Sequence, residues 1–298
     1  MVAHAELMAR IRRMMPKRNS RISITAYYTN FVWFRHGLAP SSLVPNRSWF
    51  SYLLLWPLSR LFKWAFSFDL DLYLLQRHHL MDRVLESKLK NGVQILELGS
   101  GLSARGLRTC HKFPHLNLTY VDADLSSMAS LKNRMFFGGP SRDDRLLVMS
   151  TDIRREETHE WSIEQLVHRT FDQAKPIVFV MEGVSHYLSP LEFKQLCRRL
   201  KQIMTRFPEA SFIFDMKPRP STKEATVLRM FVSLLRRITK SHVDFHYGTK
   251  SEARDGLGVA GLDSVDFYSP STHKDWLPKR IQKKLHRVWI MDASPSVP

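Results

Sequence analysis

The chain has 298 residues, 44% hydrophobic and 24% charged, which is long enough for one large domain or two small ones with a real core. This composition excludes disordered and fibrous proteins. The 45 Lys and Arg against 28 Asp and Glu give a net charge of +17, which either serves solubility or favours anionic partners: acidic lipid, nucleic acid, an acidic protein or a carboxylate substrate.

The amino-terminal part holds much of the excess charge. Residues 1–68 contain ten Lys and Arg and a single acid, Glu6. Residues 1–21 lack a continuous apolar segment, which argues against a secretory signal peptide and leaves a transit peptide as an alternative. The two cysteines, Cys110 and Cys197, have no paired spacing, so we expect a reduced, cytoplasmic protein.

Two helices are expected in this amino-terminal part, around residues 24–36 and 48–68. The second is the most apolar segment of the chain, but Pro57 interrupts it. Arg60 and Lys63 also lie inside it, and each costs about 2.5–3.5 kcal/mol near the centre of a bilayer, which argues against a transmembrane span.

The segment 48–68 has a wide aromatic face. Its members are Trp49, Tyr52, Leu53, Trp56, Leu61, Phe62, Trp64 and Phe68. Such a face packs against a core, a large hydrophobic substrate or a membrane interface. We expect core or lid packing, because a helix in a folded domain more often buries its apolar side, with membrane docking as the alternative.

A further helix is expected over residues 70–89, and short apolar runs follow it. These are residues 93–98, 118–121, 146–149, 177–181, 212–214 and 288–291. Most are separated by helical stretches, a rhythm that predicts an α/β fold with a doubly wound, mostly parallel sheet. We therefore divide the chain into a basic, aromatic-rich helical cap (1–68) and an α/β domain (69–298). One helix start is well marked, because Ser189, Pro190 and Glu192 form a capping-box pattern.

The first strand ends in a glycine-containing turn, ILELGSGLSARG, with Glu97, Gly99 and Gly101 at the change from strand to helix. Glycines there let a ligand approach the backbone. Gly106 stands five positions after Gly101 rather than three, so support for a nicotinamide or flavin site is lost. A carboxylate at Glu97 would repel a pyrophosphate but can meet the ammonium group of an amino-acid-bearing cofactor.

The second strand ends in TYVDADLS, which places an acid where a ribose acid is expected. Asp124 lies 23 residues after Gly101 and can accept two hydrogen bonds from ribose hydroxyls; Asp122 is the alternative. Ser126 is the expected N-cap of the next helix.

Four segments carry a resemblance to a known family: SITAYYTNFVWFR, LELGSGLSARGLR, STDIRRE and MEGVSHYLS. In them the chain resembles the class I S-adenosylmethionine-dependent methyltransferases, in particular the leucine carboxyl methyltransferase superfamily, which includes tetracenomycin-type polyketide O-methyltransferases. The last segment is similar to the family's Glu-Gly-x-x-x-Tyr-Leu signature. The resemblance spans residues 23–189 and implies a seven-stranded, Rossmann-like domain at 69–298 that binds S-adenosylmethionine.

The resemblance also implies roles for individual residues. Gly99, Ser100 and Gly101 would line the methionine part of the cofactor, and Asp124 would hold its ribose. The chain departs from the family at 103–104 (Ser-Ala, where Asp-Thr is frequent) and at 125–126 (Leu-Ser, where a proline follows the ribose acid). These departures bear on the identity of the substrate more than on that of the cofactor.

Further cofactor contacts follow from the same resemblance. Asp152 and Ile153 would flank the adenine, Glu182 would lie near the amino acid moiety of the cofactor, and Arg77 would pair with its carboxylate.

The expected activity is O-methyl transfer without a metal. A carboxylate acceptor, with a pKa near 4, arrives ionised and needs only aiming, whereas a phenol or enol near 10 benefits from a general base. We take Arg35, Tyr28 and Tyr187 as aiming groups and His186 as the candidate base. The acceptor would be a small molecule or peptide, anionic or aromatic, with a carboxylate preferred over a polyketide-like hydroxyl.

Other functions have weaker support. No His-Glu-x-x-His or Cys-x-x-Cys pattern occurs, so no metal site is proposed, and Ser185 lacks the second glycine of a nucleophile elbow. Basic runs at 198–206 and 279–287 have no interleaved aromatic residues, so they are weak evidence for nucleic acid and we interpret them as solvated faces, with a nucleic-acid methyltransferase as a further alternative. A non-catalytic, membrane-peripheral adaptor that keeps the fold is the alternative from another class.

Overall fold

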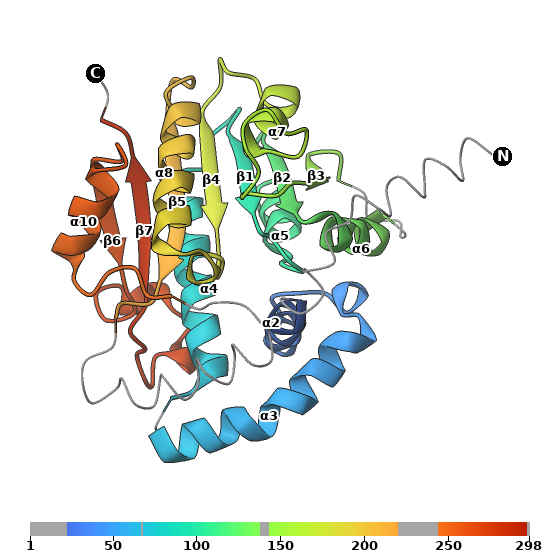
Figure 1. Cartoon of the computed structure of the whole chain (residues 1–298). Helices are drawn as coiled ribbons and strands as arrows, with labels where there is room; N and C mark the ends of the chain where they lie inside the picture. The colour runs from blue at the N-terminus through green and yellow to red at the C-terminus, as the bar shows by residue number, and fades with distance from the viewer. Residues whose placement is uncertain (1–22, 67, 138–142, 220–243, 297–298) are drawn as a thin grey trace.

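The computed structural model describes residues 23–66, 68–137, 143–219 and 244–296 (Figure 1). Its centre is a seven-stranded sheet in the order β3-β2-β1-β4-β5-β7-β6. The strands are β1 (Gln94–Leu98), β2 (Thr119–Asp124), β3 (Leu146–Ser150), β4 (Ile177–Met181), β5 (Ala210–Met216), β6 (Ser264–Tyr268) and β7 (Trp289–Ser294). Strands β1 to β5 pair in parallel, and β7 runs antiparallel to both β5 and β6.

The helices cover both faces of the sheet, as a parallel sheet requires. They are α2 (Ser23–Arg35), α3 (Asn46–Phe66), α4 (Leu70–Glu86), α5 (Arg105–Lys112), α6 (Ser126–Phe137), α7 (Ile163–Thr170), α8 (Pro190–Met204) and α10 (Lys250–Gly258), with short 3-10 turns at Ser41–Leu43, Ser185–Tyr187, Lys274–Trp276 and Lys279–Ile281. Buried side chains of α2 to α6 form a core on one face, and those of α7, α8 and α10 form a core on the other. The doubly wound, mostly parallel fold predicted from the sequence is confirmed.

The apolar runs in the sequence locate six of the seven strands. The 177–181 run coincides with β4, and the capping box forms as predicted, because the Ser189 side chain accepts from the Glu192 N–H. Strand β6 was not predicted, and α4 ends at Glu86, three residues early. Helix α6 begins at Ser126 itself, so the expectation that this serine stands before the helix as its cap is wrong.

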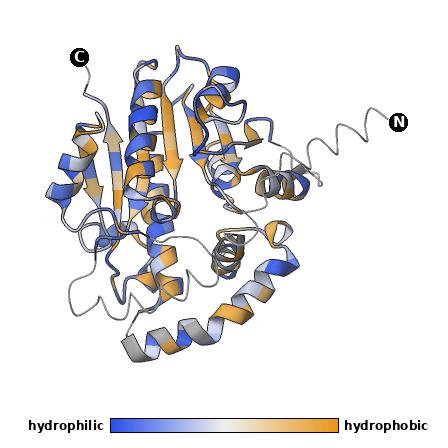
Figure 2. Ribbon diagram, viewed as in Figure 1, coloured by the Kyte–Doolittle hydropathy of each residue, from blue (hydrophilic) through white to orange (hydrophobic). Residues whose placement is uncertain are grey.

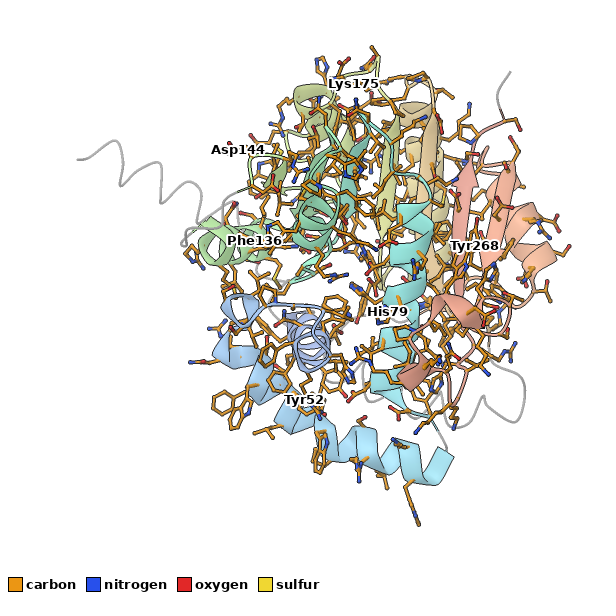
Figure 3. The ribbon with its side chains drawn as sticks, turned by 180° about the vertical axis from the view of Figure 1, so that it is seen from behind. Tyr52, His79, Phe136, Asp144, Lys175 and Tyr268 are labelled. Atoms are coloured by element: carbon orange, nitrogen blue, oxygen red, sulfur yellow. The ribbon has the colours of Figure 1, made fainter. Side chains whose placement is uncertain are left out.

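The orientation of α3 agrees only in part with the expected core or lid packing, because Tyr52 and Leu55 are buried, with Leu55 also at the cavity, while most of the predicted aromatic face is not. Helix α3 runs along the outer edge of the molecule (Figure 1), and Trp49, Leu53, Trp56, Leu61 and Trp64 are exposed. Its buried side carries serines and Tyr52, which stacks on Tyr28 of α2 and points towards α2 in Figure 3. The buried Ser48 and Ser51 lie on the same side of α3 as Tyr52 and Leu55, and most of the other bulky apolar side chains of the helix are left outside.

Sequence interpretations that concern residues 1–21 lie outside the described residues. No described helix has the length and apolar character needed to cross a bilayer. The proposed boundary between cap and α/β domain at residue 68 stays a prediction.

Candidate active site

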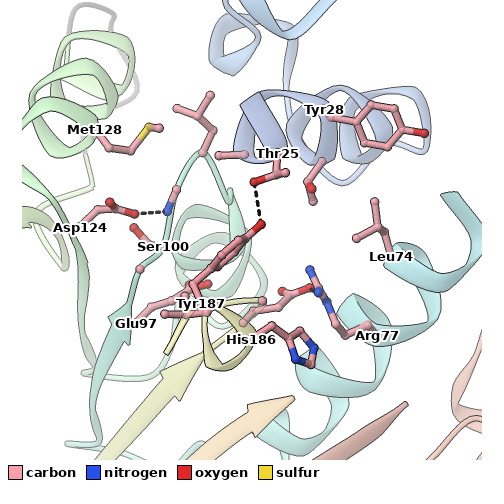
Figure 4. Close-up of a pocket in the computed structure, with 18 of the residues that line it drawn as sticks. Thr25, Tyr28, Leu74, Arg77, Glu97, Ser100, Asp124, Met128, His186 and Tyr187 are labelled. Atoms are coloured by element: carbon pink, nitrogen blue, oxygen red, sulfur yellow. Dashed lines mark hydrogen bonds and ion pairs between the residues drawn. The ribbon is translucent and has the colours of Figure 1, made fainter. Parts of the chain in front are cut away.

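A cavity of about 290 Å³ lies where the carboxyl ends of the parallel strands meet the amino-terminal helices (Figure 4). Polar residues at or just after the ends of β1 to β5 line it, which is the usual position of ligand sites in open α/β sheets. These are Gly99, Ser100 and Gly101 after β1, Asp124 at the end of β2, Asp152 after β3, Glu182 after β4 and Lys217 after β5. The opposite wall comes from α2, the inner side of α3 and the start of α4.

The loop after β1 requires glycine at two positions. Gly99 and Gly101 have φ of +65° and +51°, in the left-handed region that other residues avoid. A Cβ on Gly99 would stand 2.5 Å from a methyl group of Val184, so this position has no room for a side chain. The loop therefore presents bare backbone to the cavity.

Asp124 joins this loop to the next strand. Its Oδ2 accepts from the Gly101 N–H at 2.7 Å, the bond that is dashed at Asp124 in Figure 4. Its Oδ1 accepts from the Leu125 N–H at 2.7 Å. Burial raises the pKa of Asp124, and the two backbone N–H groups act in the opposite direction. A carboxylate fixed in this way at a cavity wall can accept hydrogen bonds from a ligand's hydroxyl groups through its remaining lone pairs. The alternative, Asp122, is fully buried beside the Lys132 ammonium (2.9 Å) and does not line the cavity.

Glu97 lines the cavity, and both of its carboxylate oxygens already have partners. Oε1 accepts from an Arg105 N–H at 2.5 Å, and Oε2 accepts from the Tyr120 hydroxyl at 2.6 Å. Burial, with the Glu97 charge next, holds the pKa of the Tyr120 phenol well above its usual range, so this hydroxyl keeps its proton and donates. The expected contact between Glu97 and a cofactor ammonium stays a prediction.

Glu182 is the centre of a buried ionic cluster below the cavity. Its Oε1 accepts from Arg77 Nε at 2.8 Å, and its Oε2 contacts His78 Nδ1 at 2.8 Å and a guanidinium nitrogen of Arg105. Arg105 also donates to Asp82 at 2.6 Å. Burial alone would raise the pKa of Glu182, but the surrounding His78 and the two arginines hold it well below its usual range. Glu182 is therefore ionised and only 4% exposed at its side chain.

Arg77 lies on α4, the helix before β1, as predicted, and it lines the cavity. Its guanidinium contacts Glu182 and, at 3.5 Å, Asp215, and a Cβ on Gly183 would stand 3.1 Å from its nitrogens. Its expected pairing with the cofactor carboxylate stays a prediction.

Asp152 and Ile153 follow β3 and line the same cavity. Asp152 accepts from the Arg154 N–H at 3.1 Å and pairs with Arg155 at 3.4 Å. Ile153 also packs against the core formed with α7 and α8. The two residues stand side by side at the cavity wall, as expected, and their adenine contacts remain predictions.

The four residues expected to act on the acceptor are not all brought to the cavity. Tyr28, His186 and Tyr187 line it, whereas Arg35 lies outside the lining and binds the Tyr52 hydroxyl. The Tyr187 hydroxyl is 3.1 Å from the Thr25 hydroxyl (Figure 4). The Tyr28 hydroxyl donates to Asp71 at 2.5 Å, and burial followed by the Asp71 charge raises the pKa of Tyr28 far above its usual value.

His186 is held by a backbone carbonyl and an aromatic ring. Its Nδ1 is 3.4 Å from the Asp244 carbonyl oxygen, and its ring lies 5.9 Å from the Phe245 ring. Burial lowers the pKa of His186 to about 3, and the Arg77 charge acts in the same direction. The imidazole is therefore neutral at physiological pH and a weak base.

Lys217 and Trp33 are among the lining residues that were not predicted from the sequence. The Lys217 ammonium lies over the Phe68 and Tyr73 rings, 4.3 and 5.3 Å from their centroids. Its position directly after a parallel strand was the signal that could have found it. The indole N–H of Trp33 is buried at the cavity and has no hydrogen-bond partner among the described residues. No group of three His, Cys, Asp or Glu side chains that could hold a metal ion occurs in the described ranges.

Comparisons with known proteins agree with this geometry. Residues 63–201 match the family model described as leucine carboxyl methyltransferase. The matched segment contains the glycine loop, Asp124, Asp152 and Glu182. A comparison with curated protein sequences gives no match.

Two solved structures that share the fold are described as methyltransferases. The S-adenosylmethionine-dependent methyltransferase SibL, in its apo form, is 12% identical with a TM-score of 0.51, over 75% of this chain and 55% of SibL. A candidate methyltransferase from Thermobifida fusca YX is 15% identical with a TM-score of 0.54, over 76% of this chain and 83% of that one. The chain thus spans little more than half of the length of SibL.

Fold and family match together define the class: the chain has the fold of the class I S-adenosylmethionine-dependent methyltransferases. Within that class, its central segment is similar to the leucine carboxyl methyltransferases, as the sequence motifs predicted. The residues present also fit the cofactor of this class, because a glycine loop with no room for a Cβ and a fixed carboxylate stand on one cavity wall.

Proposed function

We propose that the protein is an S-adenosylmethionine-dependent O-methyltransferase that methylates a carboxylate of a small-molecule or peptide acceptor. The observation that carries the proposal is the Asp124–Gly101 hydrogen bond at the wall of a cavity that α2 and α3 close from the other side. Gly99, Ser100 and Gly101 would hold the methionine part of the cofactor, Asp124 the ribose, and Asp152 with Ile153 the adenine.

Bound S-adenosylmethionine supplies a methyl group on a positively charged sulfur, ready for in-line displacement by an oxygen nucleophile. The protein's contribution is to hold the acceptor oxygen at near-attack distance and to exclude water. The aromatic side chains of Tyr28, Trp33 and Tyr73 supply the dry wall opposite the glycine loop.

A carboxylate is preferred over a phenol because of two groups in the cavity. The Lys217 ammonium supplies a positive charge that can orient a carboxylate over the Phe68 and Tyr73 rings. A phenol would need a base, and the pKa of His186, lowered by burial to about 3, makes this imidazole a poor acceptor for a phenolic proton. An ionised acid needs no proton removed.

The aromatic lining also favours an acceptor with an apolar or aromatic body next to its carboxylate. The cytoplasmic location expected from the sequence is kept as part of the proposal, since Cys110 and Cys197 are both free, buried thiols.

The proposal is tested by methyl transfer from labelled S-adenosylmethionine to a panel of aromatic carboxylic acids and matched phenols. Lys217→Met should raise KM for the acid about tenfold or more, while the affinity for S-adenosylhomocysteine stays unchanged, and Lys217→Arg should retain most of the activity. Methylation of the phenols but not of the acids would overturn the carboxylate assignment. The adaptor alternative would be favoured if cofactor binding were absent.

A further inference from the structure

We propose that the outer face of α3 docks on an anionic lipid surface, with the helix lying in the plane of the membrane interface. This inference stands apart from the proposed methyl transfer, because it rests on the outside of the molecule rather than on the cavity.

The first observation is a continuous apolar stripe on the outside of α3. Phe50, Leu54 and Trp64 are 65%, 70% and 85% exposed. Together with the exposed Leu53, Pro57 and Leu61 they follow one another at spacings of three or four residues, which places them on one side of a helix. Figure 2 shows α3 at the outer edge of the molecule, with orange turns between paler and blue ones. A soluble surface rarely leaves such a row uncovered without a binding role.

The second observation is that the helix is anchored to the body through its other side. The buried Ser48 hydroxyl donates to Asn30 Oδ1 at 2.8 Å, and the Tyr52 ring stacks on Tyr28 at 5.3 Å. Because these contacts use the serine and tyrosine side, the apolar stripe cannot turn inward without breaking them. The stripe is therefore a fixed outer surface of the described fold.

The third observation is charge. Helix α3 has no acidic residue and carries Arg47, Arg60 and Lys63, all exposed. The Arg60 guanidinium lies 5.5 Å from the centre of the Trp56 ring, and Lys63 is paired with Asp69 at 2.6 Å. Arginine and lysine beside exposed tryptophan suit the headgroup layer, where the ring is half immersed and the cation reaches the lipid phosphate.

This charge pattern also distinguishes lipid from a second copy of the chain. A twofold contact along α3 would bring Arg47 and Arg60 against the bases of the other copy, and neither helix has an acid of its own; only Lys63 is offset, by Asp69 just beyond the helix. An anionic bilayer is complementary to both features at once. Since no described helix can cross a membrane, the contact is one that lies on the surface.

The inner side of the same helix lines the cavity through Leu55 and Ser59. Only the thickness of α3 therefore separates the cavity from the proposed lipid surface.

The test uses the full chain with vesicles of phosphatidylcholine alone and of phosphatidylcholine mixed with phosphatidylglycerol. We expect co-sedimentation with the mixed vesicles only, weakened by salt, and quenching of tryptophan fluorescence by brominated lipid. Arg60→Glu and the double variant Leu54→Ser with Trp64→Ser should each weaken binding about tenfold or more. Leu191→Ser, at a site on α8 that is 66% exposed, is the matched control and should bind like the parent.

Three results would overturn the proposal: no association with either vesicle, equal association with both, or α3 variants that bind as tightly as the parent. Concentration-dependent self-association through α3 in sedimentation velocity, without lipid binding, would assign the face to a second copy instead. Should a variant fail to fold, brominated-lipid quenching of the parent chain still decides, because unquenched tryptophans in the presence of mixed vesicles would contradict docking.

Discussion

Asp124 and Gly101 are joined by a hydrogen bond of 2.7 Å between the carboxylate and the backbone N–H, so the end of β2 fixes the loop that follows β1. The two strands are neighbours and pair in parallel from Gln94 and Thr119 onward. Because the pairing register is set along the whole strand, the sheet itself brings the acid to the loop. The order of the strands in the sheet therefore positions the cavity wall that the glycine loop and Asp124 form.

A side chain should be tolerated less well at Gly99, in the loop after β1, than at Gly37, which follows α2. Gly99→Ala adds both an unfavourable φ and a 2.5 Å contact with Val184, so it should lower stability by clearly more than the 1–2 kcal/mol or so that a left-handed residue costs, and should weaken S-adenosylhomocysteine binding. Gly37→Ala, with φ of +75° and nothing within 4 Å of its Cβ, should show only the backbone cost. Urea unfolding of both variants measures the difference, and equal losses would contradict it.

Removing the buried charge of Glu182 should strongly destabilise the fold. Glu182→Gln leaves Arg77 and Arg105 buried with too little negative charge, which costs about 3–5 kcal/mol at pH 7 in unfolding experiments. Glu209→Gln, at an exposed ion pair, should stay within about 0.5 kcal/mol of the parent. A small loss at Glu182 would mean that the cluster is not maintained in solution.

The lowered pKa of Glu182 also predicts that the stability of the fold falls in acid. The pKa of Glu182 in the folded chain lies below its unfolded value, so its stabilisation is complete above about pH 4.3 and is lost as pH falls through the folded pKa. Part of the acid destabilisation of the parent should therefore be missing in Glu182→Gln. Parallel slopes of stability against pH below 4 in the two proteins would contradict this.

His186 should leave the pH profile of activity unchanged. Its pKa is lowered to about 3, so the imidazole stays neutral from pH 5 to 8 and contributes no ionisation there. The shape of the kcat/KM profile over that range should be the same in the parent and in His186→Gln, measured with the best acid of the panel. A limb near pH 6.5 that disappears in the variant would restore His186 as a titrating base.

Tyr28 should matter for stability rather than for cofactor binding. Its hydroxyl is committed to Asp71 at 2.5 Å and thereby joins α2 to α4. Tyr28→Phe should cost about 1–2 kcal/mol in thermal or urea unfolding and leave S-adenosylhomocysteine affinity unchanged. A selective loss of cofactor affinity at unchanged stability would show that the hydroxyl acts in the cavity instead.

The parallel sheet was predictable because each of its inner strands contains a short, mostly apolar run. Strand β6 was not predicted because it is an edge strand, in which exposed Ser264 and Asp266 interrupt the apolar residues. The glycine loop and Asp124 could be found because each stands at or within three residues of the end of a recognisable apolar run.

The remaining features depend on distant residues. Periodicity reports that α3 has an apolar face but not which neighbour it meets, so the outward orientation of Trp56 and Trp64 could not be predicted. Arg105 has the sequence context of a surface arginine, yet it is 1% exposed because Glu97, Glu182 and Asp82 converge on it from three separate segments. A charge can be buried only when such partners meet, and only the fold brings them together.

The central claim is tested most directly by calorimetric titration of the chain with S-adenosylhomocysteine, alongside Asp124→Ala and the matched control Asp255→Ala on the exposed side of α10. We predict saturable binding to the parent and the control, and an affinity at least about tenfold lower in Asp124→Ala with its thermal unfolding still cooperative. Absence of binding to the folded parent, or equal binding by all three proteins, would contradict the account.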